Sequence, residues 1–136
     1  EFQHEVYENP ELTPKERRMK WLEIERKYLP SRYYEEIPEL DEGLFFYRQG
    51  HLFSVPFYYI DYTLAQVCAF QFWKKANENR ENAWKEYLHL CKLGGTKPFL
   101  ELVKEANLEN PFEDGTISNI VPELRKYIDS VDATKF

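Results

Sequence analysis

The chain has 136 residues, of which 43% are hydrophobic and 31% charged, which is enough for one core but not for two independent ones. Its formal net charge of −6 argues against a nucleic-acid partner. Stretches without acidic or basic residues are too short to span a bilayer, and the polar start carries no signal peptide, so we expect no membrane partner.

The first predicted helix covers residues 1–8 and begins without a capping residue, which suggests a chain cut from something longer. The next predicted helix has a clear start at residues 13–16, Thr-Pro-Lys-Glu. The threonine can cap free amides, the glutamate can complete a capping box, and proline suits the first helical position. Pro30 ends this helix, because proline cannot continue the hydrogen-bond ladder.

The middle of the chain is predicted to lead from exposed segments into a central helix. Residues 31–42 are polar and acidic and predict an exposed connection, with a short helical turn over residues 40–47. Residues 48–57 are interrupted by glycine and proline and predict a loop or an irregular segment that borders a helix start. From residue 57 to 76 apolar residues recur at helical spacing and the opposite side is also apolar, so we expect a central helix buried on most sides.

A polar break at residues 77–79 separates this helix from the next, which is predicted over residues 80–93. Gly94 and Gly95 follow as a helix-terminating pair. The side chains expected to face inward are Ala83, Trp84, Tyr87, Leu88 and Cys91.

Two further helices are predicted, over residues 97–106 with Thr96 as a cap and over residues 116–131 with Pro122 inside. No segment shows the period-two alternation of a strand. The predicted fold class is therefore all-α, with a single helical domain over residues 1–136.

The two cysteines, Cys68 and Cys91, lie in apolar stretches. Neither CxxC nor Cys/His spacing suggests a structural metal. We expect reduced, buried thiols in a cytoplasmic protein.

Aromatic residues make up 17% of the chain, and eleven of the 23 lie between Phe45 and Trp73. One part of this group is expected to pack around the central helix: Phe45, Phe46, Phe53, Phe57, Phe70, Phe72 and Trp73.

His51 follows a glycine in the predicted loop and is the first candidate for chemistry. Histidine changes charge near neutral pH and can donate to a developing oxyanion. The alternative is a packed histidine whose ring nitrogens are satisfied by the backbone.

Tyr58, Tyr59 and Tyr62 are the second candidate, because helical spacing would align their hydroxyls near a helix start. Phenols are neutral donors at pH 7 and can stabilise an oxyanion without a countercharge. The alternative is an aromatic stripe in the core. Asp61, in the same run, is expected to be a first-turn carboxylate favoured by the helix dipole.

The pair His4-Glu5 resembles half of a zinc-protease HExxH motif, but Glu8 stands where the second histidine would be. We therefore expect no metal-binding residues here.

The block Gln-Gly-His-Leu-Phe-Ser-Val-Pro-Phe-Tyr-Tyr-Ile-Asp-Tyr-Thr-Leu-Ala-Gln over residues 49–66 strongly resembles the C-terminal signature of the oligoendopeptidase F family, bacterial relatives of thimet oligopeptidase. Residues 7–13 and 93–98 are similar to the same region of the family. The resemblance covers nearly the whole chain.

This resemblance implies a zinc-dependent peptidase that cleaves short peptides inside an all-helical chamber. The family binds zinc through HExxH and a downstream glutamate, both N-terminal to this region, so the chain resembles a C-terminal fragment of the catalytic domain. Alone, the fragment would bind no zinc and be inactive. By resemblance His51, Tyr59 and Tyr62 are catalytic donors and Tyr58 binds substrate, although each of the three tyrosines is a candidate for the donor to the oxyanion.

The implied partners are oligopeptide substrates and the N-terminal remainder of the peptidase. A surface that packed on that remainder would be exposed in the fragment and could form a homodimer. The rival functional class is a non-catalytic helical module that grips a peptide or a partner helix with exposed aromatic side chains. A third alternative is a purely structural domain in which every ring belongs to the core.

Overall fold

The computed structural model describes residues 1–34 and 37–135, which contain helices and no strand, so the all-α prediction is confirmed. These residues group into two compact units, the first from Glu1 to Ile60 and the second from Asp61 onward. The expectation of one domain over residues 1–136 stays a prediction.

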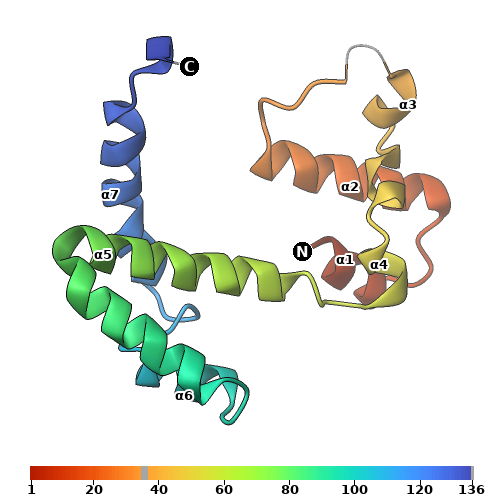
Figure 1. The fold of residues 1–136 in the computed structure, drawn as a ribbon. Coiled ribbons are helices and arrows are strands. Elements are labelled where there is room, and N and C mark those ends of the chain that lie inside the picture. Colours follow the sequence, from red (N-terminus) through yellow and green to blue (C-terminus); the bar gives the residue numbers. More distant parts are fainter. Residues whose placement is uncertain (35–36, 136) are drawn as a thin grey trace. The chain divides into compact units, whose positions relative to one another are not determined.

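The first unit contains helices α1 (Phe2–Glu8), α2 (Pro14–Tyr28), α3 (Pro38–Asp41) and α4 (His51–Ser54), with the 3₁₀ helix η1 (Leu44–Arg48) before α4 (Figure 1). The predicted start of α2 is confirmed as a complete capping box. Glu16 N donates to Thr13 Oγ1 at 3.3 Å, and Thr13 N donates to Glu16 Oε2 at 2.8 Å.

The core of the first unit lies where α1 and η1 meet α2. The Phe2 ring contacts both Trp21 and Phe46, with ring centroids 5.2 and 5.0 Å apart. Gly43 permits the close approach of η1 to α2, because it adopts φ +83° and a Cβ there would lie 2.2 Å from the Arg18 carbonyl oxygen.

The predicted exposed connection and helical turn correspond to α3, η1 and the segments around them. Residues 35 and 36 of that connection lie outside the described residues. The predicted loop over residues 48–57 is wrong in part, because α4 forms one helical turn inside it.

The second unit contains the long helix α5 (Ile60–Leu93), then α6 (Phe99–Glu105), α7 (Thr116–Ser130) and the short 3₁₀ helix η2 (Ala133–Lys135). The predicted polar break is confirmed: α5 bends sharply at Asn79, whose φ of −153° and ψ of 92° are not helical (Figure 1). The Asn79 Oδ1 atom accepts a hydrogen bond from Asn82 N at 3.1 Å and so caps the second arm. Gly94, with φ +52°, follows the helix end as expected.

Val103 of α6 and the residues Ala106 and Leu108 just after it form a small buried core. Cys68 and Phe72 from the first arm of α5 and Leu90 from its second arm pack against this core. The predicted cap at Thr96 is wrong, since the helix begins at Phe99 after Pro98 and has no side-chain cap. The helix predicted over residues 116–131 is confirmed, and it continues through Pro122.

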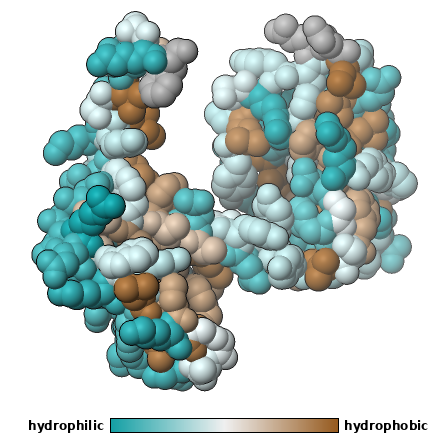
Figure 2. Space-filling view, in the orientation of Figure 1, coloured by the Kyte–Doolittle hydropathy of each residue, from teal (hydrophilic) through white to brown (hydrophobic). Residues whose placement is uncertain are grey.

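The expected burial of the central helix is wrong, because most of the N-terminal arm of α5 is exposed in this structure. On the second arm Ala83 is buried, but Trp84 is 58% exposed and Tyr87, Leu88 and Cys91 are exposed too. Of the expected packing aromatics, Phe46 is buried whereas Phe53 and Phe57 are exposed. Figure 2 shows apolar side chains at the surface of each unit.

Both cysteines are free thiols; Cys68 is partly buried, and burial raises its pKa. Across the described residues, no helix has the combined length and apolar character needed to cross a membrane.

Candidate functional site

His51 is the first residue of α4 and not a loop residue. Its imidazole stacks on the ring of Tyr59, with centroids 4.3 Å apart and planes inclined by 20°. The structure therefore brings together two of the three residues that the sequence marks as catalytic candidates.

Tyr58 and Tyr59 lie in the turn between α4 and α5, and not on the helix predicted to begin at residue 57. The physical reason is the backbone of Phe57, whose φ of +61° is incompatible with a right-handed helix. The helix starts only at Ile60, so Tyr62 lies in its first turn. The expected helical alignment of the three hydroxyls is therefore wrong.

All three tyrosines present much of their surface to solvent: Tyr58 is 47%, Tyr59 54% and Tyr62 59% exposed. These three tyrosines therefore do not form an aromatic stripe in the core, which was the alternative interpretation. Asp61 lies in the first turn of α5, as expected for a carboxylate at a helix N-terminus.

Helix α1 anchors the turn that carries Tyr58 and Tyr59. Phe57 N donates to Gln3 Oε1 at 3.1 Å. The Phe57 ring also contacts His4 and Tyr7, with centroids 4.9 and 5.5 Å apart. His4, the histidine of the incomplete motif, thus packs on the turn.

A pocket of about 340 Å³ opens beside the His51–Tyr59 pair within the first unit. Its lining residues come from α2, from the segment after it and from the region around η1: Trp21, Ile24, Glu25, Tyr28, Leu29, Arg32, Phe45, Gln49, His51 and Tyr59. The size is at the lower end of ligand-binding cavities, about 300–1,000 Å³.

A buried carboxylate forms part of this pocket. The side chain of Glu25 is only 5% exposed, and its Oε1 accepts hydrogen bonds from Arg32 Nη1 at 3.1 Å and Tyr34 Oη at 2.6 Å. Burial, followed by donation to this carboxylate, raises the pKa of Tyr34 to about 12. Sequence reasoning missed this cluster, because a glutamate among other charged residues of α2 resembles a solvated helix face.

The same arginine also contacts an aromatic wall. The Arg32 guanidinium carbon lies 4.4 Å from the centroid of the Phe45 ring, a cation–π contact.

No group of three or more His, Cys, Asp or Glu side chains with the geometry to hold a metal ion occurs within residues 1–34 and 37–135. The described residues therefore do not supply a zinc site by themselves.

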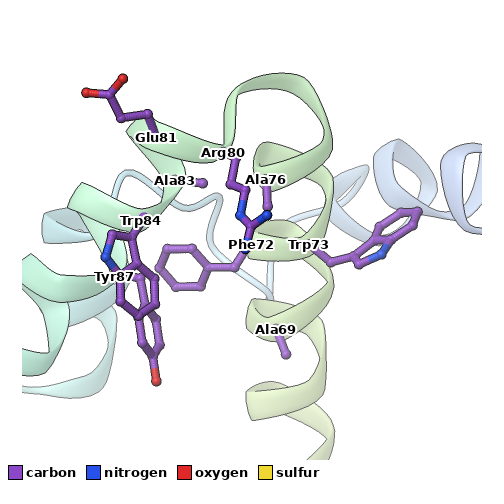
Figure 3. Close-up of a pocket in the computed structure, with 9 residues that line it drawn as sticks. All are labelled: Ala69, Phe72, Trp73, Ala76, Arg80, Glu81, Ala83, Trp84 and Tyr87. Carbon is purple, nitrogen blue, oxygen red and sulfur yellow. The ribbon is translucent and has the colours of Figure 1, made fainter.

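A second hollow, of about 790 Å³, follows the bend of α5 in the second unit (Figure 3). Phe72 on the first arm faces Trp84 and Tyr87 on the second arm, and the Tyr87 ring lies 5.6 Å from each of the other two. None of the candidate catalytic residues lines this groove.

Comparison with known proteins agrees with this all-helical structure. The sequence model of peptidase family M3 matches residues 1–121. Among solved structures, a protein assigned as oligoendopeptidase F is 56% identical, with a TM-score of 0.92 over 99% of this chain and 24% of its own. PZ peptidase A, solved with an inhibitor, is 54% identical, with a TM-score of 0.90 over 96% of this chain and 23% of its own.

A third structure, from Bacillus anthracis str. Ames and assigned as oligoendopeptidase F, is 46% identical, with a TM-score of 0.75 over all of this chain and 21% of its own. Comparison with curated proteins gives no match.

The chain therefore belongs to peptidase family M3, and the predicted similarity to oligoendopeptidase F is confirmed. It spans between 21% and 24% of the length of these solved chains, so it matches only part of each of them.

Proposed function

We propose that this chain is part of a zinc endopeptidase that hydrolyses short peptides, and that it contributes donors for the substrate and for the transition state. The membership of family M3 and the likeness to longer peptidase chains support this proposal. Because the described residues offer no group of metal ligands, the zinc would be held by residues of the N-terminal remainder. The two units would belong to one catalytic domain there.

The observation that carries the proposal is the stacked pair of His51 and Tyr59 beside a pocket. In this proposal the imidazole and the phenol hydroxyl donate hydrogen bonds to the peptide carbonyl oxygen as it becomes an oxyanion. Tyr62 is the further candidate for that donation, and Tyr58 binds the substrate backbone. Neutral phenols suit this task at pH 7, since they stabilise negative charge without a countercharge.

The test is to replace Tyr59 and Tyr62 separately by phenylalanine in the complete peptidase. Loss of a donor to an oxyanion lowers kcat by about 100- to 1,000-fold. A phenylalanine variant keeps the ring, so the melting temperature should change little. Tyr33→Phe is the matched control, because this tyrosine is highly exposed and does not line the pocket. If kcat is unchanged in both variants, the proposed role of these hydroxyls is wrong.

The rival function is a non-catalytic module that binds a peptide or a partner helix, and the exposed aromatic groove along α5 is the observation that favours it. The upstream reading frame decides between the two. A frame that continues through HExxH supports the peptidase, whereas a gene that begins near Glu1 supports the module.

A further inference from the structure

We infer that the pocket beside His51 and Tyr59 is a specificity subsite that accepts an uncharged aromatic side chain of the peptide substrate. This inference rests on the proposed peptidase function and adds the side-chain class that this part of the site selects.

The walls of the pocket are mainly aromatic and aliphatic. Trp21, Ile24 and Tyr28 contribute from α2, and Phe45 contributes from η1. Tyr59, which stacks on His51, also lines the pocket. Flat rings on several sides favour a flat ring between them, because offset and edge-on contacts between aromatic groups are favourable. A volume of about 340 Å³ suits one large side chain better than a longer segment of peptide.

The two charged groups of the pocket compensate each other. Glu25 accepts from Arg32 and from Tyr34, and the Arg32 guanidinium lies against the Phe45 ring. A charged substrate side chain would lose its hydration in the pocket and find both protein charges already paired with each other. A neutral ring does not meet this penalty, so the pocket favours an uncharged occupant.

The position of the pocket connects it to the proposed chemistry. His51 and Tyr59 line the pocket and are also the residues assigned as donors to the scissile carbonyl. A peptide held by these donors has a side chain close to the opening. The occupant is therefore a substrate side chain near the cleaved bond.

The experiment measures kcat/KM of the complete peptidase on fluorogenic peptides that carry Phe, Ala, Glu or Lys at each position around the cleaved bond. At one position we expect Phe to exceed Ala by about 10- to 200-fold, and Glu and Lys to be no better than Ala. Leu29→Trp fills the pocket from the position just after α2, so it should abolish the preference for Phe over Ala. Met19→Trp is the control, since this exposed residue of the same helix does not line the pocket.

The inference is overturned if no position prefers Phe, or if Leu29→Trp reduces cleavage of every peptide by the same factor. The second result would mean that another part of the peptidase fills the pocket. In both cases the tyrosine variants at positions 59 and 62 still report on the proposed function. A complete peptidase that cleaves none of the peptides would instead refute the proposed function itself.

Discussion

Glu25 is buried although the local sequence predicts an exposed side chain. It lies on a charged helix, yet its carboxylate is buried and accepts hydrogen bonds from Arg32 and Tyr34. Burial of a carboxylate costs free energy unless the group is paired and hydrogen-bonded. The two donors therefore offset the cost of burying Glu25 in the first unit.

We therefore predict that Glu25→Ala lowers the free energy of unfolding by about 1–3 kcal/mol, because Arg32 and Tyr34 lose their acceptor. The effect stays below that of a fully buried ion pair, since the Arg32 side chain is 37% exposed and water can replace part of the interaction. Urea denaturation followed by circular dichroism measures the change. Glu23→Ala, at an exposed position of the same helix, is the control, and an equal midpoint for both variants would refute the prediction.

At the scale of elements, the bend of α5 is held by an ion pair between its two arms. Lys75 Nζ on the first arm lies 2.6 Å from Glu86 Oε2 on the second. The loop after α6 joins this contact: Asn107 Nδ2 donates to Glu86 Oε1 at 3.0 Å, and Lys75 Nζ donates to the Asn107 carbonyl oxygen at 2.8 Å. Three segments of the second unit thus share one polar cluster.

Because of this cluster, we predict that the stability of the second unit decreases as the pH falls into the acidic range. Hydrogen bonding from Lys75 lowers the pKa of Glu86 against the opposing effect of burial, and Asn107 adds to the lowering. A carboxyl whose folded pKa lies below its unfolded value stabilises the fold above the unfolded value, near 4.5, and loses that contribution as the pH falls through the folded pKa. Glu86→Gln should remove this part of the pH dependence. Denaturation curves at neutral pH and below pH 4.5 test it, with Glu81→Gln at an exposed position as control.

The side chain of Gln71 should also stabilise the second unit, in a way that does not depend on pH. Its Nε2 donates to the Glu109 carbonyl oxygen at 3.0 Å, and its Oε1 accepts from Glu109 N at 2.7 Å, so one side chain satisfies both backbone groups. Gln71→Ala should lower the free energy of unfolding by about 1–3 kcal/mol, because two part-buried hydrogen bonds to the Glu109 backbone are lost. Thermal denaturation measures this loss, with Gln66→Ala on the exposed side of α5 as control.

Elements with a local signal could be predicted from the sequence, and contacts between distant residues could not. The capping box at residues 13–16 and the break at Asn79 depend on side chains within a few positions of the backbone that they fix. The start of α5 depends on the positive φ of Phe57, and no glycine marks it. The pairing of Gln71 with Glu109 spans 38 residues and leaves no periodic trace in the sequence.

The candidate site residues divide in the same way, into those with a local signal in the sequence and those that depend on distant contacts. His51 and Tyr59 were identified by residue type and family resemblance, and the structure places their rings in contact. The buried Glu25 and the aromatic wall around it could not be predicted, because burial of a glutamate is decided by the segments packed on α2.

At the scale of the whole molecule, the accessible surface is larger than its mass requires. The chain exposes 10,558 Å² at a mass of 16.5 kDa. A compact protein of this mass exposes about 7,600 Å², and two separate compact units of half the mass would together expose about 9,100 Å². Contact between the two units can only reduce the total, so the excess belongs to the units themselves, which expose apolar side chains such as Met19 and Trp84. In the proposed peptidase the N-terminal remainder covers them.

We expect the 136-residue chain by itself to form homodimers, because exposed apolar groups such as Trp84, in the groove of the second unit, gain most from being removed from water. Trp84→Ala should weaken the dimer by about tenfold or more, since buried tryptophans commonly dominate interface energies. Tyr33→Ala removes an exposed ring from the first unit and is the control. Size-exclusion chromatography with light scattering over a range of concentrations measures the dimer, and a monomer at every concentration would show that the exposed groove does not drive association.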